Sequence, residues 1–183
     1  MRIESTPLQD VFVLSPKVFK DSRGFFYEFF NASAFQRQTG LQIDFVQDNF
    51  AGSAKGVLRG LHFQKPPYAQ AKLVSVLQGS VLDVVVDLRK KSATFGQYFS
   101  IILSSSNKKQ LFIPRGMAHA YLSLEDNTLF FYKIDNIYHP GSEAGIRFDD
   151  PMLKIDWKYD LSQVILSEKD RNLPTLKDII PHL

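Results

Sequence analysis

The sequence predicts an all-β protein, built as an antiparallel sandwich or barrel with a few short helices. Aromatic residues reach 13%, with 16 phenylalanines among 183 residues, and flat rings pack well on pleated sheets. Short runs rich in β-branched and aromatic residues follow one another, with turn signals between them. Helical patterns between these runs are absent, which argues against a parallel α/β sheet.

The N-terminal part predicts two strands, at residues 10–14 and 24–30, with a turn at residues 21–24 between them. A short helix is expected at residues 31–38. Asn31 suits its N-cap because the side chain can accept a backbone hydrogen bond, and Gly40 suits the left-handed position just beyond its end.

The central part predicts a β-hairpin, because the apolar runs 72–77 and 81–88 flank Gly79. Period-two alternation then places one set of side chains on a shared face: Lys72, Val74, Val76, Val81, Asp83 and Val85. The opposite face is mostly leucine and valine and predicts core. A lysine and an aspartate among valines leave two interpretations: a solvated face with a weak ion pair, or a ligand cavity with Lys72 directed at an anion.

Four further strands are expected before the β pattern ends near residues 149–151: residues 98–103, 110–113, 120–124 and 129–134. Residues 167–172 then predict a helical turn, which Pro174 ends. No linker or repeat interrupts the chain. We therefore expect one domain over residues 1–183 whose tail, from about residue 151, packs on it.

Composition and charge exclude several classes of protein. The net charge is only +3 and no basic run exceeds residues 89–91, so no nucleic-acid surface is expected. The N-terminus lacks the apolar core of a signal peptide, and no apolar stretch approaches the roughly 20 residues of a membrane span. Cysteine is absent, which removes disulfides and thiolate metal sites and indicates a cytoplasmic protein.

Two histidines lie in spacings that are typical of the cupin fold. His62 ends a Gly-x5-His segment and His119 ends a Pro-x-Gly-x-x-His segment, so the chain resembles a cupin, a small jelly-roll barrel. Metal-binding cupins add a second histidine and a glutamate after the first, where this chain has Gln64, Tyr68 and Ala69. Two lone histidines make a poor metal site, so we expect no metal and no cofactor.

A longer series of segments carries a more specific resemblance. The sequence reads DSRGFFYE at 21–28, FVQDN at 45–49, VLRGLHFQ at 57–64, AQAKLV at 69–74 and SATFG at 92–96. It continues with QLFIPRG at 110–116, YK at 132–133, Glu143 and SEKD at 167–170. In this order the segments resemble the dTDP-4-dehydrorhamnose 3,5-epimerase family, and the resemblance spans nearly the whole chain.

The resemblance implies an isomerase that inverts C3 and C5 of dTDP-4-dehydro-6-deoxy-D-glucose to give dTDP-4-dehydro-L-rhamnose, in dTDP-rhamnose biosynthesis. It implies that His62 is the general base, oriented by Asp170. It also implies that Tyr132 is the general acid, that Lys72 steadies the enolate oxygen, and that N-terminal strands reach across a homodimer. The residues that it implies for substrate binding are Arg23, Phe26, Glu28, Gln47, Asn49, Arg59, His119, Tyr138, Glu143 and Lys169.

General chemistry agrees with these roles. A proton next to a ketone becomes removable when a nearby cation, here Lys72, stabilises the enolate. Histidine titrates near neutral pH, and a carboxylate such as Asp170 can fix its tautomer. A diphosphate prefers forked guanidinium groups, which Arg23 and Arg59 supply.

Two departures from the family pattern keep alternatives open. Residues 116–121 read Gly-Met-Ala-His-Ala-Tyr where the family usually has Gly-Phe-Ala-His-Gly-Phe, and residues 137–140 read Ile-Tyr-His-Pro where it usually has Tyr-Tyr-Ser-Pro. One alternative is an epimerase that inverts a single carbon of a related dTDP-4-keto-6-deoxy sugar. Another is a non-catalytic cupin that binds a sugar. A metal-dependent cupin enzyme is disfavoured by Gln64.

Overall fold

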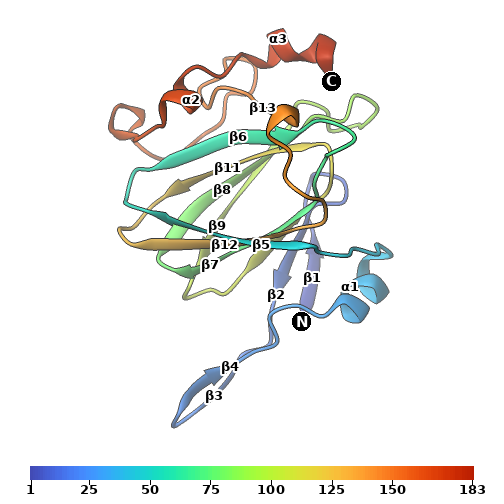
Figure 1. The fold of residues 1–183 in the computed structure, drawn as a ribbon. Helices are drawn as coiled ribbons and strands as arrows, with labels where there is room; N and C mark the ends of the chain where they lie inside the picture. Colours follow the sequence, from blue (N-terminus) through green and yellow to red (C-terminus); the bar gives the residue numbers. More distant parts are fainter.

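Two antiparallel sheets face each other in the computed structural model, which describes residues 1–183 (Figure 1). The first sheet has the order β1 (Arg2–Ser5), β2 (Phe12–Ser15), β10 (Gln110–Ile113), β7 (Lys72–Gln78), β12 (Thr128–Ile134) and β5 (Gln47–Ser53). The second has the order β13 (Glu143–Gly145), β6 (Leu58–Gln64), β11 (Met117–Ser123), β8 (Ser80–Asp87) and β9 (Tyr98–Ser104). Most neighbouring strands are far apart in sequence, as in a jelly roll, which confirms the predicted cupin-like, all-β fold.

The helices are few and short. In α1 (Ala32–Thr39) both predicted caps are present: Asn31 Oδ1 accepts from the Ala34 N–H at 2.9 Å, and Gly40 has a φ of 75°. The tail contains α2 (Glu168–Arg171), as predicted, and α3 (Leu176–Ile179). Three 3-10 turns complete the set, η1 (Pro140–Ser142), η2 (Leu161–Gln163) and η3 (Ile180–His182). None of the helices has the length and apolar character needed to cross a membrane.

The predicted hairpin around Gly79 is wrong, because β7 and β8 belong to different sheets. β7 pairs with β10 and β12, whereas β8 pairs with β11 and β9. The turn at Gly79, with a φ of 77°, carries the chain from one sheet to the other. The predicted shared face is nevertheless present as the barrel interior, where four of its residues join one buried cluster: Val74, Val76, Val81 and Val85. Alternation determines which side chains share a face, but not whether two strands pair edge to edge or face to face.

The two sheets also carry apolar clusters on their outer faces. On the second sheet, Trp157 and Leu176 of the tail belong to one buried cluster with Leu82 and Val84. Against the first sheet α1 packs Phe35, in a cluster with Leu14, Ala71, Leu73 and Phe112. Strands β7 and β8 are therefore buried on both faces along most of their length, which explains their nearly continuous apolar sequence.

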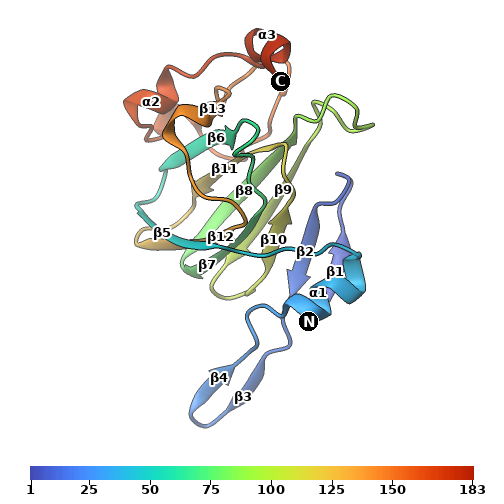
Figure 2. The same ribbon diagram turned by 45° about the vertical axis from the view of Figure 1, so that its right-hand side comes forward.

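A two-stranded arm formed by β3 (Phe19–Asp21) and β4 (Gly24–Phe26) projects away from the barrel (Figures 1 and 2). The strand predicted at residues 24–30 is therefore too long. After Phe26 the chain returns to the body, where the carbonyl of Phe29 accepts a hydrogen bond from Gln110 Nε2 at 2.7 Å. The ring of Phe30 packs against Phe35 of α1. The second half of this aromatic run therefore packs against α1 instead of pairing as a strand.

Candidate active site

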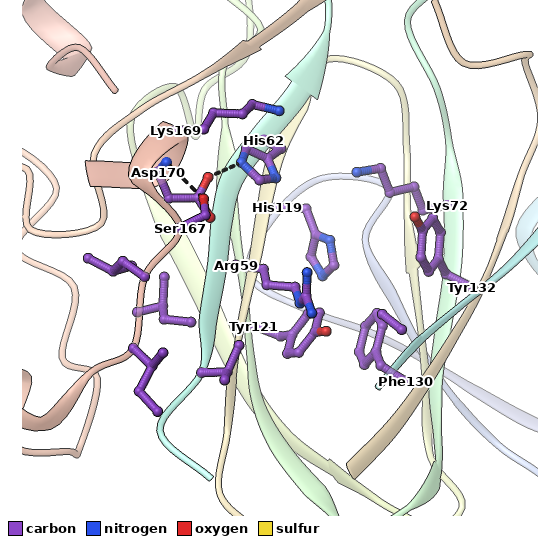
Figure 3. A pocket seen from close by; sticks show the side chains of 15 residues that line it. Arg59, His62, Lys72, His119, Tyr121, Phe130, Tyr132, Ser167, Lys169 and Asp170 are labelled. Carbon is purple, nitrogen blue, oxygen red and sulfur yellow. Dashed lines mark hydrogen bonds and ion pairs between the residues drawn. The ribbon is translucent and has the colours of Figure 1, made fainter. Parts of the chain in front are cut away.

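A cavity of about 560 Å³ opens between the two sheets. The second sheet contributes His62 from β6 and His119 from β11, and the first contributes Lys72 from β7 and Tyr132 from β12 (Figure 3). A smaller cavity of about 290 Å³ shares His62, Lys72 and Tyr132 with the first, so the two are joined. The tail closes a further side of the larger cavity with Ile165, Leu166, Ser167, Lys169 and Asp170.

A β-bulge at Gly60 explains how Arg59 and His62 reach the same cavity. In a regular strand, residues three apart point to opposite faces. Here the pairing of β6 with β11 shifts by one residue: His119 lies opposite His62, but Tyr121 lies opposite Arg59. Gly60 suits this position because its φ is 123° and any side chain would collide with β11. The bulge therefore turns both Arg59 and His62 toward the space between the sheets.

His62 is bound to Asp170, as predicted, although the two lie 108 residues apart in the chain: His62 Nε2 is 2.6 Å from Asp170 Oδ1. Ser167 caps α2 and accepts the Asp170 backbone N–H at 3.1 Å. Burial opposes the charge of Asp170, but hydrogen bonds from His62, Ser167 and the Gly60 backbone hold its pKa below the ordinary value. An ionised carboxylate only accepts, so Nε2 carries the hydrogen and Nδ1 is left to take a proton.

Lys72 and Tyr132 face the two histidines from the opposite wall (Figure 3). Burial lowers the pKa of Lys72 to about 8, against the attraction of Asp83 and Glu143. Burial also raises the pKa of Tyr132 above its ordinary value, so its hydroxyl keeps its proton at neutral pH. A histidine paired with a carboxylate thus lies on one sheet, and a lysine and a protonated tyrosine lie on the other.

A second histidine–aspartate pair lies deeper in the barrel. His119 Nε2 is 2.9 Å from Asp83 Oδ2, and the side chains are only 8% and 0% exposed. Burial lowers the pKa of His119, against the attraction of Asp83. His119 was predicted to contact substrate and does line the cavity. Its pairing with Asp83 was not predicted, because the sequence pattern grouped Asp83 with Lys72 instead.

The smaller cavity carries a chain of polar contacts at its rim. The Tyr138 hydroxyl donates to Glu143 Oε2 at 2.7 Å, and Lys169 Nζ lies 2.5 Å from Glu143 Oε1. Gln47 Nε2 donates to Asn49 Oδ1 at 2.8 Å on β5. These five residues were all predicted to bind substrate, and the structure gathers them around the joined cavities.

Three other predicted binding residues lie outside both cavities of this chain. Arg23, at the tip of the arm, pairs with Asp21 at 2.6 Å and is 88% exposed. Phe26 is 70% exposed, and Glu28 accepts a hydrogen bond from Asn31 Nδ2 at 3.0 Å. Both views show the arm directed away from the barrel (Figures 1 and 2). A single chain therefore does not bring Arg23, Phe26 and Glu28 to its own cavity.

Sequence reasoning missed the residues that hold Arg59 in place. The Tyr121 hydroxyl is 3.0 Å from Ser53 Oγ, Arg59 Nε donates to Ser53 Oγ at 3.4 Å, and Arg59 Nη2 donates to the Gly52 carbonyl at 3.1 Å. Alternation along β11 places Tyr121 on the same face as His119. That periodicity was the available signal for Tyr121, whereas nothing local marked Ser53.

Gln64 stands where a metal-binding cupin has a ligand. Its Oε1 accepts the backbone N–H of His139 at 3.2 Å and so holds the loop before η1. No group of three or more histidine, aspartate or glutamate side chains is arranged to hold a metal ion. Gln64 therefore shapes the rim of the smaller cavity, which it lines.

Known proteins match the chain over nearly its whole length. The family model described as dTDP-4-dehydrorhamnose 3,5-epimerase matches residues 5–178. A protein of that name from Escherichia coli K12 is 50% identical over 180 residues, covering 98% of this chain and 97% of the relative. A crystal structure of such an epimerase from Elizabethkingia anophelis has a TM-score of 0.94 at 50% identity, covering 97% of both chains. Another from Legionella pneumophila, in complex with dTDP-4-keto-L-rhamnose, has a TM-score of 0.92 at 47% identity, covering 96% of this chain and 93% of that one.

Proposed function

The chain belongs to the dTDP-4-dehydrorhamnose 3,5-epimerase family and is an isomerase of dTDP-rhamnose biosynthesis, and we propose that its joined cavities bind dTDP-4-dehydro-6-deoxy-D-glucose. There it inverts C3 and C5 to give dTDP-4-dehydro-L-rhamnose. The observation that carries this assignment is the His62–Asp170 pair opposed to Lys72 and Tyr132 across the cavity. The cysteine-free composition supports a cytoplasmic location.

One set of groups serves both inversions, because C3 and C5 are the two neighbours of the C4 ketone. His62 takes the proton from the carbon, the C–H electron pair forms a carbon–carbon double bond, and the ketone oxygen becomes the enolate oxygen. Asp170 fixes which nitrogen of His62 accepts the proton and stabilises the imidazolium that results. Lys72 stabilises the negative oxygen in a site where water screens it little.

Inversion also needs a proton from the other face of the sugar, since return from the same face restores the starting configuration. Tyr132 lies on the sheet opposite His62 and keeps its proton at neutral pH. It donates that proton to the carbon while the enolate electrons return to form the ketone. Tyr132 then regains a proton from solvent, and His62 releases its own.

The remaining polar residues suit a nucleotide diphosphate. Arg59 and Lys169, both on the larger cavity, present cations to phosphate oxygens, and a guanidinium does so with a fork. Gln47, Asn49 and Tyr138 surround the smaller cavity with amides and a hydroxyl, which suit the hydroxyl groups of a sugar. The sugar then lies beside the residues that both cavities share, and the diphosphate at the larger cavity joins it to the nucleoside.

We further propose a homodimer in which the arm of each protomer completes the site of its partner. Arg23, Phe26 and Glu28 offer a cation, an aromatic face and a carboxylate, yet lie away from their own cavity. Phe25 is also 59% exposed on the same arm. Apolar rings held out on an isolated two-stranded ribbon indicate a surface that a partner covers.

Mixing two inactive variants tests the shared site. If the arm acts across the dimer, Arg23→Ala and His62→Ala fall in the same site of a mixed dimer, and its other site is intact. Random mixing should then restore about a quarter of all sites. Restoration should be absent if the arm serves its own chain, and a monomer in analytical ultracentrifugation would contradict the dimer.

Proton NMR of the product formed in heavy water tests the reaction itself. Incubation with dTDP-4-dehydro-6-deoxy-D-glucose should introduce two deuterons, at C3 and C5, with inversion at both. Incorporation at a single carbon would instead identify a single-carbon epimerase. Binding without any incorporation would indicate a sugar-binding module.

A further inference from the structure

Strand β8 carries two fully buried aspartates, Asp83 and Asp87, which differ in the number of hydrogen bonds that they accept. Asp87 accepts hydrogen bonds from Arg89, Ser92 and Thr94 on both of its carboxylate oxygens. Asp83 accepts one, from His119, and its Oδ1 has no hydrogen-bond partner. A buried carboxylate oxygen without a partner lowers stability. Hydrogen bonding within the fold therefore does not explain why a carboxylate occupies position 83.

The cation that Asp83 attracts is Lys72, which lies on the opposite sheet and lines the same cavity as His119, the hydrogen-bond partner of Asp83. The attraction between Lys72 and Asp83 acts through space, without a hydrogen bond. The other titratable and charged groups that line the two cavities with Lys72 are Arg59 and His62 on β6, His119 and Tyr121 on β11, Tyr132 on β12, Tyr138, Glu143 on β13, and Lys169 and Asp170 on α2. Asp170 is paired with His62. Glu143 is already paired with Lys169 and Tyr138. Asp83 is therefore the carboxylate beside Lys72 whose charge no other cation neutralises.

We propose that Asp83 is a positioning residue for the reaction, whose carboxylate is the internal counter-charge that keeps Lys72 protonated in the dry cavity while holding His119 in place. This rests on the proposed function, in which Lys72 must be a cation to stabilise the enolate. Burial disfavours a charged lysine, and a pKa of about 8 leaves Lys72 protonated at neutral pH by a narrow margin. Without the attraction of Asp83, that pKa falls further.

The decrease of enzyme activity at alkaline pH should depend on this effect of Asp83 on Lys72. Turnover that needs protonated Lys72 falls as the pH rises through the pKa of Lys72, so a lower pKa moves the fall to lower pH. Tyr132 loses its proton only above its raised pKa, at higher pH than Lys72. A shift of the alkaline side alone therefore isolates Lys72.

Asp83→Asn and Asp87→Asn form a matched pair on one strand. An asparagine at position 83 can still accept from His119 but carries no charge. For Asp83→Asn we expect the alkaline fall of kcat/KM to move down by about one pH unit or more, with about tenfold lower activity at alkaline pH. Its thermal unfolding temperature should stay equal or rise, because a partly unpaired buried charge is removed. Asp87→Asn should unfold at lower temperature, yet keep the wild-type position of the alkaline fall.

Direct titration of Lys72 by NMR of ¹³Cε-labelled lysine provides a second measurement, with Lys72→Met to assign the signal. The Lys72 pKa should be lower in Asp83→Asn than in Asp87→Asn. A uniform loss of activity at every pH, equal Lys72 titration in both variants, or failure of Asp83→Asn to fold would each overturn the proposal. A wild-type protein that exchanges no α protons would refute the reaction instead, while the Lys72 titration would still decide the role of Asp83.

Discussion

The two histidine–aspartate pairs of the cavity are built in different ways. His62 and Asp170 join β6 to a helix of the tail, 108 residues away, and the His62 side chain remains 27% exposed. His119 and Asp83 lie on the adjacent strands β11 and β8, and both are almost completely buried. The exposed pair can exchange protons with substrate and solvent. The buried pair cannot do so readily and is suited to fixed electrostatic support.

The largest effect should follow the loss of the exposed histidine. His62→Ala removes the base for both inversions, so exchange of α protons with deuterium should fall by about 10³-fold or more. Calorimetry should still detect dTDP binding, because the nucleotide is held by other residues. His119→Ala is the comparison, and an equal loss of exchange in that variant would erase the distinction between the two pairs.

A smaller loss is expected for the cation that the buried pair supports. Lys72→Met should lower kcat by about 10²- to 10³-fold, since the charge that Lys72 opposes develops mainly in the transition state. Steady-state kinetics should show little change in KM. A variant that raised KM and left kcat intact would show that Lys72 binds the ground state only.

Tyr132→Phe separates proton removal from proton return. His62 and Lys72 remain, so α protons should still exchange with deuterium, while inverted product forms about 10²-fold more slowly. NMR of exchange and of stereochemistry in one sample measures both, and C5 should be affected most. Normal inversion at both carbons would assign the acid to water or to another side chain.

Asp170→Asn tests the carboxylate of the His62–Asp170 pair. The charge that stabilises protonated His62 is lost, and the amide can present its N–H₂ to the ring, so kcat should fall by about 10- to 100-fold. Asp149→Asn is a matched control, because Asp149 pairs with Arg147 at 2.6 Å on the surface. Unchanged turnover in Asp170→Asn would show that His62 needs no orienting partner.

The smallest effect should come from the cap that holds Asp170. Ser167→Ala should lower the free energy of unfolding by about 1 kcal/mol, as for a lost N-cap, and turnover by a few-fold. Thr175→Ala removes the corresponding cap of α3 in the same tail, away from the cavity. It should cost similar stability in denaturant titration and leave turnover unchanged; an equal loss of turnover in both variants would make the Ser167 effect a general loosening of the tail.

Local patterns anticipated much of the fold. The caps of α1, Asn31 and Gly40, are adjacent in sequence to the helix that they begin and end, so both could be identified from the sequence. Strands β10 and β12 each contain an apolar or aromatic run, Leu-Phe-Ile and Leu-Phe-Phe-Tyr, which made them predictable. Strands β5 and β6 were not predicted, because β5 is interrupted by polar residues and Gly52, and β6 is broken by the bulge at Gly60.

The sequence by itself determined the chemistry of the cavity and the face on which it lies. Side-chain alternation put Lys72 and Asp83 on one face, and the family resemblance implied the roles proposed for His62 and Tyr132. Tertiary structure alone decided that β7 and β8 face each other rather than pair, because backbone hydrogen bonds can form with either edge whatever the side chains are. It likewise decided the partner of each histidine, since a contact across 36 or 108 residues depends on how the whole chain closes.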